Sequence, residues 1–309
     1  MGAFWAHLQA GSMFIILSLW WTYHGFREHI RCVCQGKEFI PQIYFRSSRC
    51  CMRNRRLPPL EICGRILMAL IGFLGEFFDE GFGFEDENGD FRKTLNMTHC
   101  TVYGLFLIQG VVDLISWMRF PVPKDLNYLL FAISFLWFAV AFYLHELHAE
   151  NKMPLERICH QLQIISFVPT GVAFLFEMVH RKGFTTVFIR MLGVMTIGTW
   201  FVQMAFILFI HDGRFPGSEP APQWNQGDMR NVHFAMAAYG AHIAMNIVIL
   251  LTFYLFLAFV YRRLHGLDFM LAEDNGNTRY KDIKGGKKAV YDENINLSLL
   301  CEDYEEDTD

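Results

Sequence analysis

The sequence lacks several features that mark the common classes of soluble protein. Only 19% of its 309 residues are charged, and its glycines form neither a Walker nor a Rossmann pattern. Its eight cysteines are not spaced as a disulfide framework. No basic region precedes the first apolar segment, which argues against a cleaved signal peptide. These absences point away from a nucleotide-binding enzyme and from a small disulfide-rich secreted domain.

Apolar residues are abundant instead. They make up 53% of the chain, and 31 of them are phenylalanines, which is too apolar for an ordinary soluble domain of this size. Crossing the hydrocarbon core takes about 20 residues of helix. Seven segments are long enough, near residues 9–26, 63–82, 99–118, 126–148, 158–179, 185–211 and 232–261. The sequence therefore predicts an all-α fold, a polytopic bundle of seven transmembrane helices in the lipid bilayer.

The distribution of positive charge predicts the orientation of these segments. Lys and Arg gather in the connection 27–62, and such connections remain cytosolic. Seven spans then place the N-terminus outside or in the lumen and the C-terminus in the cytosol. We expect a transmembrane domain over residues 1–262 and a disordered, acidic-ended cytosolic tail over 263–309. The net charge of −4 gives no reason to expect a nucleic-acid partner.

Most of the histidines fall at the outer ends of the predicted spans. Imidazole is the commonest metal ligand in proteins, and Zn²⁺ accepts it together with carboxylate oxygens. Ionisable groups inside membrane segments are costly and suggest a function. The sequence predicts a zinc site built from a subset of His99, His148, His160 and His242 with help from Glu76. A hydrogen-bonded polar plug without metal is the alternative.

Other polar residues suggest smaller sites. Asp113, Glu177 and Arg190 lie near the cytosolic end and are expected to form a charge-paired clamp between helices, with a proton relay as the alternative.

Cysteines suggest two modifications. Four of them lie beside basic residues on the cytosolic side, which suits S-palmitoylation; they are Cys32, Cys34, Cys50 and Cys51. A zinc site and unmodified thiols are the alternatives for this group. Cys100 and Cys159 are expected at the outer face, where a disulfide could join them.

The tail contains "YKDI", in which Tyr280 is followed at the third position by the bulky Ile283. An adaptor protein could bind this stretch as an extended peptide, so we expect a sorting signal here. The acidic end of the tail is the alternative address.

Several stretches resemble the transmembrane protein 45 family over residues 5 to 260. They are "AHLQAGSMFIILSLWW", "GVVDLI", "HAENKMPLERICHQL", "PTGVAFLFE", "GTWFVQMAFILF" and the stretch from His233 to Asn246. The matched polar positions are His7, Glu76, His99, Asp113, His148, His160, Glu177, Gln203, His233 and His242. The chain departs from the family's His-x-His with Glu146 in "HELH". The resemblance implies a multi-pass protein of the Golgi, endosome, lysosome or plasma membrane.

Two functions remain open. The first is a non-enzymatic membrane protein that acts in endomembrane trafficking or signalling. The second is a zinc-dependent membrane hydrolase acting on a lipid amide or ester, with Glu76 or Asp79 as the candidate base and no catalytic residue assigned. Hydrolases similar to alkaline ceramidase carry His-x-x-x-His in the last span, whereas this chain has Asn246 at the second position. Apart from zinc, no cofactor is expected.

Overall fold

The structure is a computed structural model. It describes residues 2–35, 37–45, 59–79, 88–91, 94–147, 153–181, 183–209, 224–265, 269–274 and 277–282. In these stretches the chain forms the helices α1 (Gly2–Gln35), α2 (Leu60–Phe78), α3 (Thr94–Trp117), α4 (Leu126–Leu147), α5 (Pro154–Val179), α6 (Phe184–Phe209) and α7 (Met229–His265). Two strands follow, β1 (Phe269–Asp274) and β2 (Asn277–Asp282). The predicted helical fold is confirmed.

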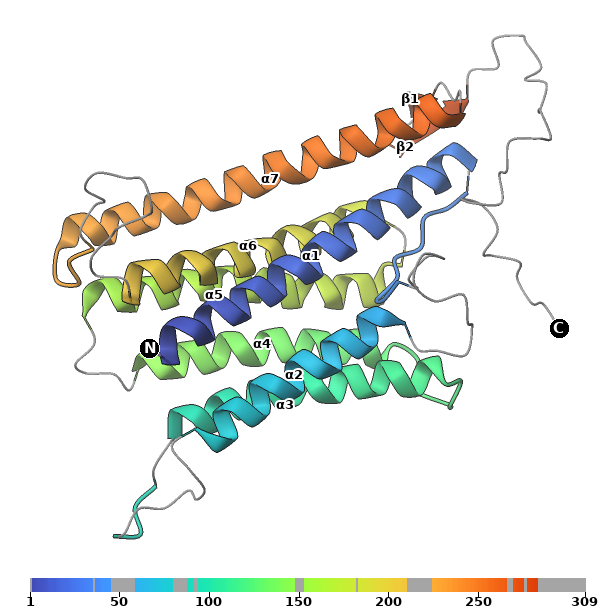
Figure 1. Cartoon of the computed structure of the whole chain (residues 1–309). Coiled ribbons are helices and arrows are strands. Elements are labelled where there is room, and N and C mark those ends of the chain that lie inside the picture. The colour runs from blue at the N-terminus through green and yellow to red at the C-terminus, as the bar shows by residue number, and fades with distance from the viewer. Residues whose placement is uncertain are drawn as a thin grey trace.

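Each helix runs antiparallel to the one before it, so the bundle has two ends (Figure 1). We call them the Gly2 end and the Gln35 end, after the residues at which α1 begins and ends. Helices α3 to α7 are long and apolar enough to cross a bilayer, as expected of a polytopic membrane protein. Helices α1 and α2 are not among these candidate spans, and α2 carries the charged residues Glu61, Arg65 and Glu76.

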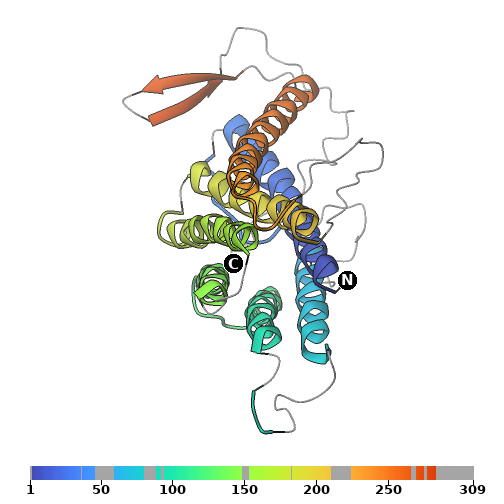
Figure 2. The same cartoon turned by 90° about the vertical axis from the view of Figure 1, so that its left-hand side faces the viewer.

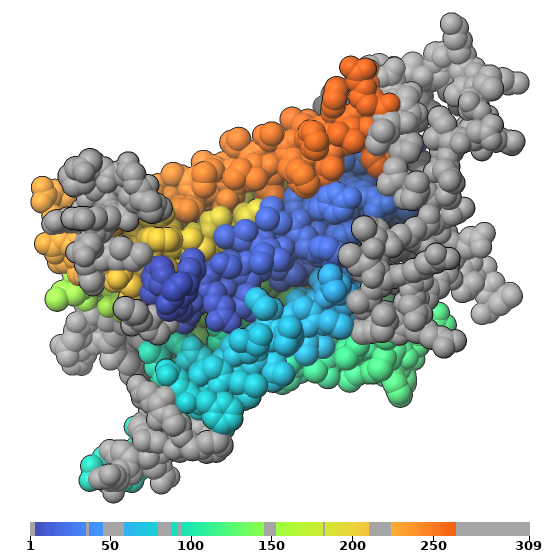
Figure 3. Space-filling view, viewed as in Figure 1, coloured from blue at the N-terminus to red at the C-terminus, as the bar shows by residue number. Residues whose placement is uncertain are grey.

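The packing order leaves α1 and α2 on the same side of the molecule. Helix α4 lies between α3 and α5, α2 packs on α3, and α6 packs on both α5 and α1. Helix α7 covers α5, α6 and α1. Viewed along the helices, α3, α4 and α5 follow one another on one side, and α1 and α2 lie on the other (Figure 2). On the face shown in Figure 3, α1 lies between α7 and α2.

Aromatic side chains fill the centre of this arrangement. Phe131 of α4 stacks on Phe174 of α5 with 4.7 Å between the ring centroids, and the rings of Phe138 and Phe167 are tilted with 4.2 Å between their centroids. Such pairs stabilise a core beyond the area they bury. The same cluster includes Trp21 of α1, which is fully buried.

The first connection differs from the prediction. Residues 27–35 were expected to belong to a cytosolic loop, but α1 continues through them because Phe26 and Ile30 are buried against the bundle. The chain then returns along the Gln35 end. We call residues 37–45 the return segment; its Ile43 and Phe45 are buried, with exposed fractions of 4% and 6%.

The first part of the tail forms regular secondary structure, whereas we expected the tail to be disordered. Helix α7 passes the predicted boundary at 262 and ends at His265. Strands β1 and β2 then pair antiparallel, with Leu271 opposite Tyr280. An isolated two-stranded hairpin is only marginally stable in water. Disorder of the tail in solution therefore stays a prediction.

Two glycines allow α1 and α6 to approach to backbone contact. A Cβ atom on Gly198 would lie 2.7 Å from the amide nitrogen of Ile15 and 2.9 Å from the carbonyl oxygen of Gly11. Close backbone approach at small residues is a common basis of helix association in membranes. We expect Gly198→Ala to lower the stability by about 1–3 kcal/mol, because the added carbon overpacks the contact.

Thermal unfolding of detergent-purified protein measures this effect. Gly240→Ala is the matched control, because a Cβ atom at this helical glycine meets nothing within 4 Å. We expect the control to be neutral or slightly stabilising, since Ala favours the helix over Gly. Equal melting temperatures for both variants would contradict the close contact between α1 and α6.

Candidate functional site

A buried carboxylate near the Gln35 end joins three parts of the chain. Glu61 of α2 accepts hydrogen bonds from the indole nitrogens of Trp20 and Trp21 in α1, at 2.8 and 2.7 Å. It also accepts one from the backbone N–H of Phe45, at 2.8 Å. One turn further on, Arg65 lies 3.5 Å from the Glu61 carboxylate. Glu61 therefore connects α1, the return segment and α2.

Arg65 extends this group to α3. Its guanidinium lies 2.8 Å from the Asp113 carboxylate and donates to the side-chain oxygen of Gln109 at 2.7 Å. Gln109 in turn donates from its amide nitrogen to Asp113. The guanidinium also lies over the ring of Phe131, 5.0 Å from its centroid. Asp113 is fully buried, so Arg65 supplies the positive charge that a carboxylate in this environment needs.

A second buried ion pair joins α5 and α6. The guanidinium of Arg190 lies 3.0 Å from the Glu177 carboxylate, and both side chains are fully buried. Arg190 also donates to the carbonyl oxygen of Gln42 in the return segment, at 3.2 Å. Its guanidinium packs over the rings of Trp21 and Phe174. The two charged groups thus lie on either side of Trp21, and the return segment contacts both.

The predicted clamp divides between these two groups. Glu177 and Arg190 lie together, whereas Asp113 pairs with Arg65 on α2. Sequence reasoning missed Glu61 and Arg65, because it assigned Glu61 to the basic connection. Their spacing of four residues at the start of an apolar helix was the available signal.

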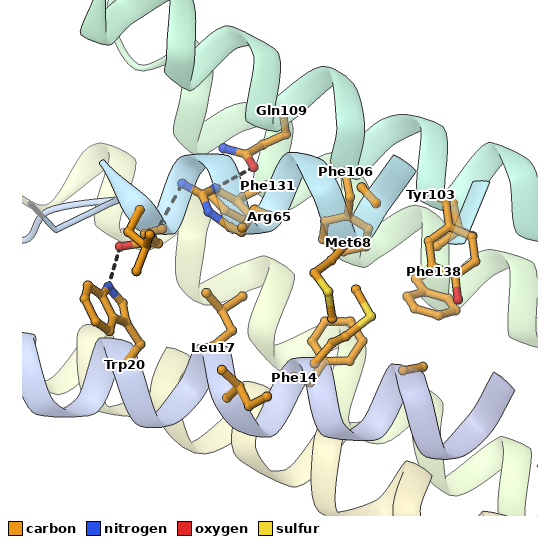
Figure 4. A pocket seen from close by; sticks show the side chains of 18 residues that line it. Phe14, Leu17, Trp20, Arg65, Met68, Tyr103, Phe106, Gln109, Phe131 and Phe138 are labelled. Carbon is orange, nitrogen blue, oxygen red and sulfur yellow. Dashed lines mark hydrogen bonds and ion pairs between the residues drawn. The ribbon is translucent and has the colours of Figure 1, made fainter. Parts of the chain in front are cut away.

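An apolar cavity of about 370 Å³ begins at the Arg65 group. It lies between α1 and α2 and extends against α3 and α4. Figure 4 shows Arg65 and Gln109 at its polar end, with aromatic rings such as Phe14, Phe106 and Phe138 along its length. This volume falls in the range of about 300–1,000 Å³ that small-molecule sites occupy.

The mouth of the cavity faces the surroundings of the bundle. Ile16 of α1 and Leu60 of α2 line it and are 64% and 47% exposed. Gly64 lies on the same side and adds no side chain to close it. Because Glu61, Arg65 and Gln109 bond to one another and to the protein, the cavity presents mainly hydrocarbon to an occupant. Its chemistry suits an apolar guest.

The predicted metal ligands lie in separate places. His99 lies 3.2 Å from the carboxylate of Glu76, which also accepts a hydrogen bond from Asn96 at 3.1 Å. His160 is buried, with its ring centroid 6.1 Å from that of His7. His242 packs edge-on against Trp200, with 5.6 Å between the centroids.

These positions leave the zinc prediction untested. His148 lies outside the described residues. Among the residues that the structure describes, no three His, Cys, Asp or Glu side chains are placed to hold a metal ion. Two pairs of candidate ligands do lie close together: His99 with Glu76, and His7 with His160.

The thiols differ in their suitability for modification. Cys32 is 7% exposed, and burial raises the pKa of its thiol to about 11, which disfavours the nucleophilic thiolate. Cys34 is partly exposed, so acylation of the described pair is expected there first. Cys50 and Cys51 lie outside the described residues, as does Ile283 of the sorting motif.

The disulfide considered between Cys100 and Cys159 is not formed in this structure, in which both residues are thiols. Cys100 faces α2, where its thiol lies 3.8 Å from the carbonyl oxygen of Phe73. Cys159 is buried in a cluster with Trp200 of α6, which donates a hydrogen bond to its backbone carbonyl oxygen. The two helices turn these residues toward different neighbours.

One comparison with known proteins bears on the chain. A family model described as a family of unknown function (DUF716) matches residues 127–255, which run from α4 into α7. Proteins of the transmembrane protein 45 family belong to that family. The match covers less than half of the chain and leaves out α1, α2 and α3, which provide most of the cavity lining. It supports similarity to a membrane protein family without an assigned activity.

Proposed function

We propose that this protein is a non-enzymatic multi-pass membrane protein that binds the hydrocarbon part of a membrane lipid between α1 and α2. The observation that carries the proposal is the apolar cavity of about 370 Å³ with its mouth at Ile16, Leu60 and Gly64. In a bilayer this mouth opens toward lipid chains. The charges at the inner end are paired with one another, Arg65 with Glu61 and Asp113, so they do not require a charged headgroup.

The proposal includes all seven helices as spans, with the N-terminus outside and the C-terminus in the cytosol. Basic residues support this orientation, because Arg119, Lys124, Arg181, Arg262 and Arg263 all lie at the Gln35 end. Helices α1 and α2 can cross despite their charged residues, since Glu61 is buried with its partners inside the bundle.

We place this activity in endomembrane trafficking or signalling, with adaptor contact through the tail around Tyr280. The resemblance to the transmembrane protein 45 family and the "YKDI" motif support this assignment. A lipid-binding span pair suits a trafficking role, because it lets membrane composition influence the protein. Zinc binding by the histidines of the Gly2 end, and with it the hydrolase alternative, is a separate hypothesis that metal analysis of purified protein tests.

Photoactivatable lipids test the proposed cavity. Purified protein in nanodiscs is irradiated with a diazirine-bearing fatty acid or sterol, and labelled peptides are mapped by mass spectrometry. We expect labels on residues that line the cavity, such as Met13 and Met68. Comparing the two probes distinguishes an acyl chain from a sterol ring system.

Gly64→Leu is the variant that fills the cavity. A Cβ atom at Gly64 meets nothing within 4 Å, so a larger side chain extends the lining without striking the backbone. We expect roughly tenfold weaker labelling, equivalent to about 1.4 kcal/mol in binding. Gly75→Leu is the matched control on the same helix, because its Cβ position is also open but lies outside the cavity. Equal labelling of both variants and the natural protein would sink the proposal.

A further inference from the structure

A group of polar side chains lies between α5, α6 and α7, away from the cavity and from the buried ion pairs. We call it the polar seam and define it by Gln163, Ser166, Thr196, Thr199, Tyr239 and Asn246. Four of these side chains belong to α5 and α7, and the two threonines belong to α6. Gln163 and Asn246 are both fully buried. The proposed lipid cavity uses none of these residues.

Hydrogen bonds across the seam show that the three helices meet there. The hydroxyls of Ser166 and Tyr239 lie 2.5 Å apart. The Gln163 amide donates to the carbonyl oxygen of Ile197 at 3.2 Å. The Asn246 amide donates to the hydroxyls of Thr196 and Thr199, at 3.2 and 3.0 Å.

All these contacts fall at nearly the same depth in the bundle. Gln163 and Asn246 are anchored to residues 196–199 of α6, and His242 packs on the next residue, Trp200. Five helical residues rise by only about 6 Å from first to last. The polar groups of α5 and α7 therefore face one turn of α6.

Three buried polar atoms of α5 and α7 at this depth lack a hydrogen-bond partner among the described residues. They are the side-chain oxygens of Gln163 and Asn246 and the Nδ1 atom of His242. Exchanging the oxygen and nitrogen of the Asn246 amide does not remove the problem. The two threonine hydroxyls would then donate to the oxygen and leave the amide N–H groups without acceptors. A buried amide left half bonded is costly and calls for an occupant.

We infer that the polar seam binds ordered water between α5, α6 and α7. Water donates to amide oxygens and imidazole nitrogens and typically makes about three such bonds when buried. A cation would also suit the oxygens, but the seam holds no carboxylate among its described residues. The nearest buried carboxylate on α5, Glu177, is already paired with Arg190. An uncompensated buried charge is expensive, so the neutral ligand is favoured.

Hydroxyl-radical footprinting tests this inference in the full-length protein in nanodiscs. Radicals formed from bound water modify buried side chains next to it. We expect Tyr239 to be modified several times faster than Tyr128. The two tyrosines are matched in burial, at 4% and 3% exposed, and Tyr128 donates directly to the carbonyl oxygen of Pro41. Equal rates for the two residues would overturn the inference.

Replacing the amides provides an independent readout. Asn246→Leu and Gln163→Leu remove water-bonded groups, so we expect each to lower the melting temperature by about 2–4 °C. In a dry seam the same changes also remove the unsatisfied oxygens, which offsets the direct hydrogen bonds that are lost, so the melting temperature would stay the same or rise. Ser134→Ala is the control, because the Ser134 hydroxyl bonds within its own helix to Leu130. If Na⁺ raised the melting temperature and choline did not, the seam would bind a cation and not water, and the inference would be overturned.

Discussion

Arg190→Met is expected to destabilise the protein by about 3–5 kcal/mol, because it leaves Glu177 as an unpaired charge in the interior. Both side chains are fully buried, and their contact is 3.0 Å long. The substitution also removes the hydrogen bond to the Gln42 carbonyl oxygen and thereby loosens the return segment. Thermal or chemical unfolding in detergent measures the loss.

A double substitution separates the unpaired charge from lost packing. Arg190→Met combined with Glu177→Leu removes both charges and keeps apolar volume, so much of the stability should return. Arg230→Met is the matched control for an ion pair in water. Arg230 is 91% exposed and lies 2.6 Å from Asp228, and we expect little change in stability because water and salt screen this pair. If Arg190→Met behaved like this control, the buried pair would not stabilise the fold.

The helices could be predicted from the sequence because each shows a long apolar run. Their pairing could not, since an apolar run does not specify its neighbour. Asp113 illustrates the difference: its depth suggested a contact with Glu177 and Arg190, but α3 packs on α2 and turns Asp113 toward Arg65. The cavity could not be predicted for the same reason. It lies between α1 and α2 and depends on how these two helices are placed.

The histidines show a second limit of sequence reasoning. Depth along the membrane follows from position in a helix, and it placed most of them toward the Gly2 end. Direction around the helix axis depends on neighbours. His99 faces Glu76, His160 lies near His7, and His242 packs on Trp200. A common layer therefore does not imply a common site.

Glu61→Ala is expected to be as damaging as Arg190→Met, at about 3–5 kcal/mol, because the Glu61 carboxylate is the shared acceptor of several groups. The indoles of Trp20 and Trp21 and the backbone N–H of Phe45 all donate to it. Its removal leaves buried donors without an acceptor and Arg65 with less compensating charge. Glu61→Gln should lose less, since its amide oxygen still accepts hydrogen bonds.

The return segment provides a local measure of this loss. Ile43 is 4% exposed, so a cysteine placed there by Ile43→Cys should react slowly with maleimide in the otherwise natural protein. We expect Glu61→Ala to accelerate the reaction at this position, because Phe45 loses the bond that holds the segment against α2. Glu76→Ala is the control on the same helix: its carboxylate bonds Asn96 and His99 near the Gly2 end. We expect it to cost about 1 kcal/mol and to leave the labelling rate unchanged. Slow labelling in both variants would mean that the apolar contacts of Ile43 and Phe45 hold the return segment in place without Glu61.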